Sequence, residues 1–144
     1  MIEKVLKTTD CLKVNPKPTP TRVERPLGTD KKGPPSEGKW KYDSVIGMLM
    51  YLASNSKLDI AFAVHQCARF THCTKRSHEQ AVIQICRYLK GTINDGLIFK
   101  PTKDLRVDLF CDADFAGLWG AEDPQDPVCV KSRTRYISLL FSIK

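Results

Sequence analysis

The sequence has no long hydrophobic run, and this limits the classes of protein that it can encode. Its longest largely apolar stretch covers residues 45–53, well short of the ~18 residues that a membrane-spanning helix needs. The first ten residues carry four charged side chains and lack the apolar segment of a secretory signal. We therefore expect an intracellular protein, in the cytoplasm or the nucleus, that has no transmembrane helix and keeps its six cysteines as free thiols.

Several enzyme motifs are also missing. The sequence contains neither a glycine-rich phosphate loop nor a Gly-x-Ser-x-Gly segment, so it offers no signature of P-loop or nucleophile-elbow chemistry. His65, Cys67, His72 and Cys73 lie near one another in sequence. They do not form the two closely spaced pairs of a structural zinc site, which disfavours zinc.

Positive charge dominates, with a formal net charge of +7 that is unevenly spread. Residues 1–41 hold 10 Lys and Arg against 5 Asp and Glu, and residues 42–100 hold 7 against 4. Residues 101–144 reverse the balance, with 6 against 7. A basic first and middle part suits a polyanion such as nucleic acid, and it equally suits a solvated, lysine-rich surface.

The first 41 residues are rich in proline and show no hydrophobic period. Six of the nine prolines lie there, in segments such as NPKPTPT and KKGPPSEG. Proline removes an amide donor and disfavours helix in the residue before it. We predict an irregular tether over residues 1–41 that touches the rest of the protein at Leu27 and Trp40.

Residues 42–95 have the apolar period of a helical bundle. Helices are predicted over about 44–54, 59–71 and 78–90, with Asp59 and Ser77 as N-terminal caps of the second and third. Short connections make neighbouring helices antiparallel. The predicted core consists of Val45, Leu49, Leu52, Ile60, Val64, Val82, Ile85 and Leu89.

After the third predicted helix the period changes to the alternation of β-strands. Residues 105–111 alternate apolar and polar side chains, and residues 97–99 and 136–141 are further strand candidates. Two or three strands without a following helix make an incomplete layer. The predicted fold class is therefore α+β, a small three-helix bundle over 42–95 followed by an incomplete antiparallel β-sheet over 96–144.

Two acidic residues, Asp112 and Asp114, follow the predicted strand closely. Carboxylates at a strand end are ligands for Mg²⁺, and two-metal phosphoryl-transfer sites contain several of them. An Asp-x-Asp segment is also common in solvated turns. We expect this pair to bind one metal ion weakly at best.

Basic residues on the predicted helices form a candidate surface for a phosphate backbone. Arg87 and Lys90 are three residues apart and share one helix face. The full set of candidates is Arg69, Lys75, Arg76, Arg87 and Lys90. Charges that only keep the protein in solution would have the same pattern.

Five sequence blocks resemble the Pol polyproteins of copia-type retrotransposons. They are KYDSVIGMLMYL at 41–52, DIAFAV at 59–64, RYLKGT at 87–92, DADFAG at 112–117 and KSRT at 131–134. The blocks keep the family's order. The resemblance implies that the helices are a thumb or connection region after the reverse-transcriptase palm, and that the strands open the ribonuclease H domain.

The resemblance also assigns a role to Asp112, which matches the first metal-binding carboxylate of the ribonuclease H domain. The intact family enzyme uses Mg²⁺ there. The paired aspartates of the polymerase site are missing, because no two aspartates are adjacent in the 144 residues. Leu58 and Arg135 stand where the family has Pro and Gly. The remaining ribonuclease H carboxylates are not found before Lys144, so we expect a catalytically inactive fragment that needs no cofactor.

Three functional hypotheses follow. The chain is a truncated polyprotein fragment without catalysis, or a fragment that still binds an RNA–DNA hybrid or another nucleic acid without regard to sequence. The third hypothesis is an element-derived partner-binding or effector-like protein with no nucleic-acid role. A gel-shift experiment with a hybrid, titrated with salt, separates the first two.

Overall fold

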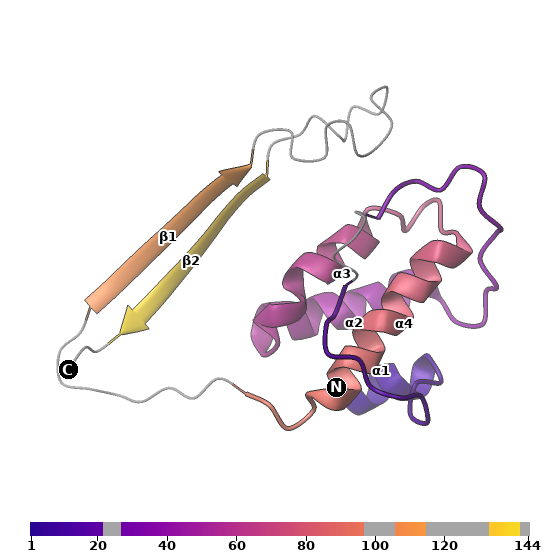
Figure 1. The fold of residues 1–144 in the computed structure, drawn as a ribbon, viewed down its shortest axis with the longest axis horizontal. Coiled ribbons are helices and arrows are strands. Elements are labelled where there is room, and N and C mark those ends of the chain that lie inside the picture. Colours follow the sequence, from indigo (N-terminus) through magenta and orange to yellow (C-terminus); the bar gives the residue numbers. More distant parts are fainter. Residues whose placement is uncertain (22–26, 97–105, 115–132, 142–144) are drawn as a thin grey trace. The chain divides into compact units, whose positions relative to one another are not determined.

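The computed structural model describes residues 1–21, 27–96, 106–114 and 133–141. The chain divides into two compact units, residues 1–96 and residues 97–144. The first unit contains helices α1 (Ile2–Thr8), α2 (Tyr42–Asn55), α3 (Ala61–Ala68) and α4 (Arg76–Gly91), with a 3₁₀ turn at Leu58–Ile60 before α3 (Figure 1). None of the helices in these ranges has the length and apolar character needed to cross a bilayer.

The three predicted helices are confirmed, but two of their ends differ from the prediction. The segment around Asp59 forms the 3₁₀ turn, so Asp59 does not cap α3, and its Oδ2 accepts the Tyr88 hydroxyl at 2.5 Å. Helix α4 begins one turn earlier than a Ser77 cap requires, with Lys75 as its N-cap. The Ser77 hydroxyl instead donates to Asp30 Oδ2 at 2.6 Å.

The tether expected over residues 1–41 contains a helix, α1, and this corrects the prediction. Val5 and Leu6 of α1 are buried in the core. The hydroxyls of Thr8 and Thr9 donate to the carbonyls four residues earlier, each at 2.9 Å. A helix this short is unstable in isolation, so its contacts with α2 and α4 stabilise it.

The rest of the predicted tether agrees with expectation. Within the described part of residues 9–41 the chain forms no helix, and its one β-bridge joins Pro35 to Lys75. Leu27 and Trp40 pack against the core, as predicted. The Trp40 and Tyr42 rings are stacked with centroids 5.8 Å apart. Apolar anchors therefore hold this segment at its two ends.

One hydrophobic core joins the four helices. All eight residues that the sequence predicts for the core are at most 3% exposed. Burying one such side chain stabilises the fold by roughly 1.5–3 kcal/mol before the entropy cost. The bundle therefore depends on the apolar period that identified its helices.

The second unit contains an antiparallel pair of strands, β1 (Arg106–Asp114) and β2 (Arg133–Phe141). The predicted strand runs further than expected, so Asp112 lies within β1 and pairs with Arg135. The strand candidate at 97–99 and the acidic loop after β1 lie outside the described residues. An incomplete ribonuclease H-like sheet stays a prediction.

Replacing Leu49 or Ile85 with alanine should lower the free energy of unfolding by about 2–5 kcal/mol, because each change leaves a cavity in the core. Urea unfolding followed by circular dichroism measures this loss. Met50→Ala is the matched control, since Met50 is 39% exposed, and it should cost less than about 1 kcal/mol. Equal losses for Leu49→Ala and Met50→Ala would contradict the described core.

Candidate nucleic-acid interface

Two of the predicted basic residues, Arg87 and Lys90, hold the N-terminal segment against α4. Arg87 Nε donates to the Asn15 carbonyl at 2.6 Å. Lys90 Nζ donates to the Val14 carbonyl at 2.9 Å. Both side chains leave α4 on the same face, as the spacing of three predicts. The structure therefore confirms that they lie together, and it adds a partner that the sequence did not indicate.

Further contacts continue this arrangement along α4. The Lys17 amide donates to the Arg87 carbonyl at 3.3 Å, and Gln84 Nε2 donates to the Thr19 carbonyl at 2.8 Å. The ribbon of residues 14–19, which we call the N-terminal strap, accordingly runs beside α4 (Figure 1). Side chains of α4 supply hydrogen bonds that the strap, without regular structure, cannot make internally.

The strap leaves the charge of this face in place. The carbonyl partners of Arg87 and Lys90 are neutral, so these contacts do not neutralise either cation. A guanidinium has five N–H donors and an ammonium has three, so each keeps donors for a further acceptor. Lys13 and Lys17 are exposed on and beside the strap and add two positive charges. The sequence analysis missed both lysines, because nothing in the pattern places the strap on α4.

The other three candidates lie around the connection from α3 to α4. The Arg69 guanidinium lies 5.1 Å from the centre of the Phe70 ring. Lys75 is the N-cap of α4 and half-buried. Arg76 is exposed and pairs with Glu37 at 2.9 Å. These residues serve local contacts at the start of α4.

The five candidates therefore do not form one cluster. Arg76 and Arg87 stand near opposite ends of α4, separated by eleven residues, or about 16 Å of helix. A duplex backbone is long enough to touch both ends. The cluster that the described contacts bring together is the strap face: Lys13, Lys17, Arg87 and Lys90.

A buried carboxylate anchors a second irregular segment at the start of α4. Glu79 is 7% exposed, and its Oε1 accepts the Ser36 hydroxyl at 2.5 Å and the Gly38 amide at 3.2 Å. Its Oε2 accepts the Glu37 amide at 2.9 Å. Gly38 has a φ of 65°, a left-handed conformation that favours glycine. The first turn of a helix also favours a negative charge.

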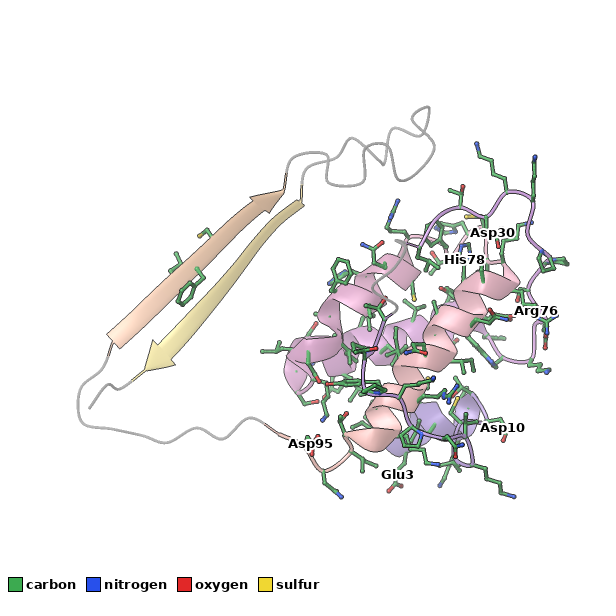
Figure 2. The ribbon with its side chains drawn as sticks, in the orientation of Figure 1. Glu3, Asp10, Asp30, Arg76, His78 and Asp95 are labelled. Carbon is green, nitrogen blue, oxygen red and sulfur yellow. The ribbon has the colours of Figure 1, made fainter. Side chains whose placement is uncertain are left out.

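His78 lies fully buried beside this anchor, and both of its ring nitrogens have partners. Nδ1 accepts the Lys75 amide at 3.0 Å, so Nε2 carries the proton and donates to the Gly28 carbonyl at 2.8 Å. The ring stacks on Phe70 with centroids 4.2 Å apart. Figure 2 shows His78 and Asp30 at this end of α4. His78 thus has a structural role and offers no nitrogen to a metal.

The two acidic candidates are described only through the backbone of β1. Asp112 pairs with Arg135 and Asp114 with Arg133 in the antiparallel register. The side chains of both aspartates lie outside the described part of the structure. Among the side chains that are described, no three His, Cys, Asp or Glu residues are placed to hold a metal ion. Metal binding by this pair stays a prediction.

Glu79→Gln should lower the free energy of unfolding by about 1–3 kcal/mol, because an amide oxygen replaces only one of two carboxylate acceptors. Urea unfolding measures the change. The exposed neighbour Gln80 provides the control, and Gln80→Ala should stay within about 0.5 kcal/mol of the wild type. A Glu79→Gln protein as stable as the wild type would show that the anchor contributes nothing.

Comparison with known proteins relates the chain to retrotransposons. It is 39% identical over 77 residues, 54% of its length, to the Retrovirus-related Pol polyprotein from transposon RE1 of Arabidopsis thaliana, and spans 5% of that polyprotein. It is 36% identical over 67 residues, 46% of its length, to the Uncharacterized mitochondrial protein AtMg00240 of the same plant, and spans 60% of it. It is also 34% identical over 76 residues, 53% of its length, to the Secreted RxLR effector protein 161 of Plasmopara viticola, and spans 54% of it.

No family model matches the sequence. No solved structure matches it significantly. The chain covers less than two thirds of each of these three relatives. It has a distant similarity to copia-type retrotransposon Pol polyproteins and to related plant mitochondrial proteins.

Proposed function

We propose that the chain is a segment of a copia-type Pol polyprotein that follows the reverse-transcriptase palm and enters the ribonuclease H domain. Support comes from the similarity to retrotransposon polyproteins and from the five sequence blocks in the family's order. In this proposal the helical unit is the thumb or connection region. Strands β1 and β2 then open the ribonuclease H domain.

This segment has no catalytic activity in the proposal. The polymerase reaction of the family needs paired aspartates, and no two aspartates are adjacent in the sequence. Hydrolysis in a ribonuclease H site depends on metal ions held by several carboxylates. Asp112 matches one of them, and Asp114 is the second acid on β1. Mg²⁺ gives up its waters reluctantly, so two carboxylates hold it weakly.

The helical unit binds nucleic acid through phosphate contacts, with an RNA–DNA hybrid as the expected partner. The observation that carries this proposal is that Arg87 and Lys90 hold the strap through neutral carbonyls and keep their charge. The exposed Lys13 and Lys17 widen the same basic face. Phosphate contacts position a duplex without reading its bases, so binding is independent of sequence.

An RNA–DNA hybrid should bind with an affinity that falls steeply as salt rises. The double variant Arg87→Ala/Lys90→Ala should bind more weakly and lose about 2 from the slope of log K against log salt, since each phosphate contact contributes about 0.9. Fluorescence anisotropy at several NaCl concentrations measures both quantities.

The matched control for this variant is Lys32→Ala/Lys41→Ala, which removes two exposed charges outside the strap and α4. It should retain most of the slope. Circular dichroism checks that both variants keep their helices. An affinity that does not change with salt, or two variants with equal losses, would contradict the assignment to the strap face.

The purified chain should leave the RNA strand of a hybrid intact in the presence of Mg²⁺. A gel of end-labelled RNA tests this, with Asp112→Asn as the partner sample. The proposal expects the two samples to be indistinguishable. RNA cleavage by the wild type that disappears in Asp112→Asn would show that the site is active.

A second candidate function is binding of a protein partner without any nucleic-acid role. The similarity to a protein named as a secreted effector favours it. The helical unit also exposes large apolar side chains at Met50, Tyr51, Leu58 and Phe62. Absence of hybrid binding at low salt by a folded protein would favour this function over the first.

A further inference from the structure

The thiols of Cys11 and Cys86 meet where the segment after α1 crosses α4. The two side chains are hydrogen-bonded to each other, although they lie far apart in sequence. Cys11 is 1% exposed and Cys86 is 0% exposed, so the core encloses the pair. The Cys11 amide also donates to the Leu6 carbonyl at 2.8 Å, which fixes its backbone at the end of α1.

We propose that Cys11 and Cys86 form a reversible disulfide that locks α1 and the start of the strap onto α4 under oxidising conditions. Sulfur atoms that share a hydrogen bond need to approach by only about 1.5–2 Å to reach the ~2.05 Å of a disulfide. Rotation of the two side chains supplies such a movement. Helices α1 and α4 already contact each other, so the bond requires no change of fold.

The surroundings select Cys11 as the thiol that reacts first. The hydrogen bond with the Cys86 thiol lowers the pKa of Cys11 below its usual range, against the opposing effect of burial, and Arg87 contributes a smaller lowering. The same hydrogen bond and burial raise the pKa of Cys86. The thiolate is the reactive form of cysteine, so the pair reacts through the Cys11 sulfur.

A hydroperoxide is the oxidant in this proposal, and the reaction balances in two steps. The Cys11 thiolate attacks a peroxide oxygen, the O–O bond breaks, and the leaving oxygen takes up a proton, which leaves a sulfenic acid on Cys11. The Cys86 sulfur then attacks the Cys11 sulfur, the S–O bond breaks, and water leaves with the Cys86 proton. Two thiols lose two electrons in total, and the hydroperoxide gains them. A dithiol reductant reverses the bond.

Access of the oxidant requires the strap to open. Its contacts with α4 are a few hydrogen bonds near the surface, at Val14, Asn15 and Lys17. Segments held in this way open locally at a low cost in free energy. Once formed, the disulfide closes a long loop and removes freedom from the unfolded chain, so the oxidised protein is more stable. This inference does not rest on nucleic-acid binding.

The test uses the full chain with the exposed cysteines Cys73 and Cys111, and also Cys129, replaced by serine. After treatment with hydrogen peroxide, free thiols are alkylated under denaturing conditions and the protein is digested with trypsin without reductant. Tryptic peptides 8–13 and 77–87 should appear as one cross-linked species, about 2 Da lighter than their sum because two hydrogens are lost.

Cys67 serves as the internal control in the same sample. Burial raises the pKa of its thiol to about 12, so it should be recovered alkylated. The melting temperature of the oxidised protein should rise by about 10 °C or more and return on addition of dithiothreitol. Both effects should vanish in Cys11→Ser and in Cys86→Ser made in the same background.

Two results would overturn the proposal. One is recovery of Cys11 and Cys86 as separate alkylated or over-oxidised residues after complete treatment. The other is a cross-link that joins Cys67 to either of them. Both outcomes are measured in the background protein, so they remain decisive if the single serine variants fail to fold.

Discussion

The burial of one face of α4 is the constraint on which the helical unit depends. Val82, Ile85 and Leu89 recur at helical spacing and have no exposed surface. This places α4 at the centre of the core and leaves its two edges for polar contacts. At its C-terminal end, Lys57 Nζ donates to the Thr92 and Asp95 carbonyls at 2.5 and 2.6 Å. A cation there also suits the negative end of the helix dipole.

The polar edges of α4 explain how a proline-rich chain is ordered without helix or strand. Glu79 and His78 bind the backbone of the loop at 28–38, and Arg87 and Lys90 bind the backbone of the strap. In each case a side chain of α4 satisfies a peptide group that has no partner in secondary structure. The same residues make the strap face basic, because the strap offers carbonyls and not carboxylates. Structure and proposed function thus depend on the same contacts.

The period of apolar residues was sufficient to predict α2, α3, α4 and their core. It missed α1, since a helix of seven residues gives too short a pattern and sits before a proline-rich segment. The composition of residues 1–41 suggested a loose tether, but its contacts depend on single side chains of α4 that no local pattern marks. The charge pattern identified Arg87 and Lys90 and omitted Lys13 and Lys17, which only the path of the strap brings to them. The metal role of Asp112 rests on resemblance and stays a prediction.

The claim that joins these observations is that α4 binds the irregular N-terminal segments in the free protein. Amide hydrogen exchange followed by NMR tests it directly, because three amides of these segments donate to α4. The account predicts slow exchange at Lys17, whose partner is the Arg87 carbonyl, and at Glu37 and Gly38, whose partner is Glu79. Exchange of these amides at the rate of an unstructured peptide, while the α4 core stays protected, would contradict it.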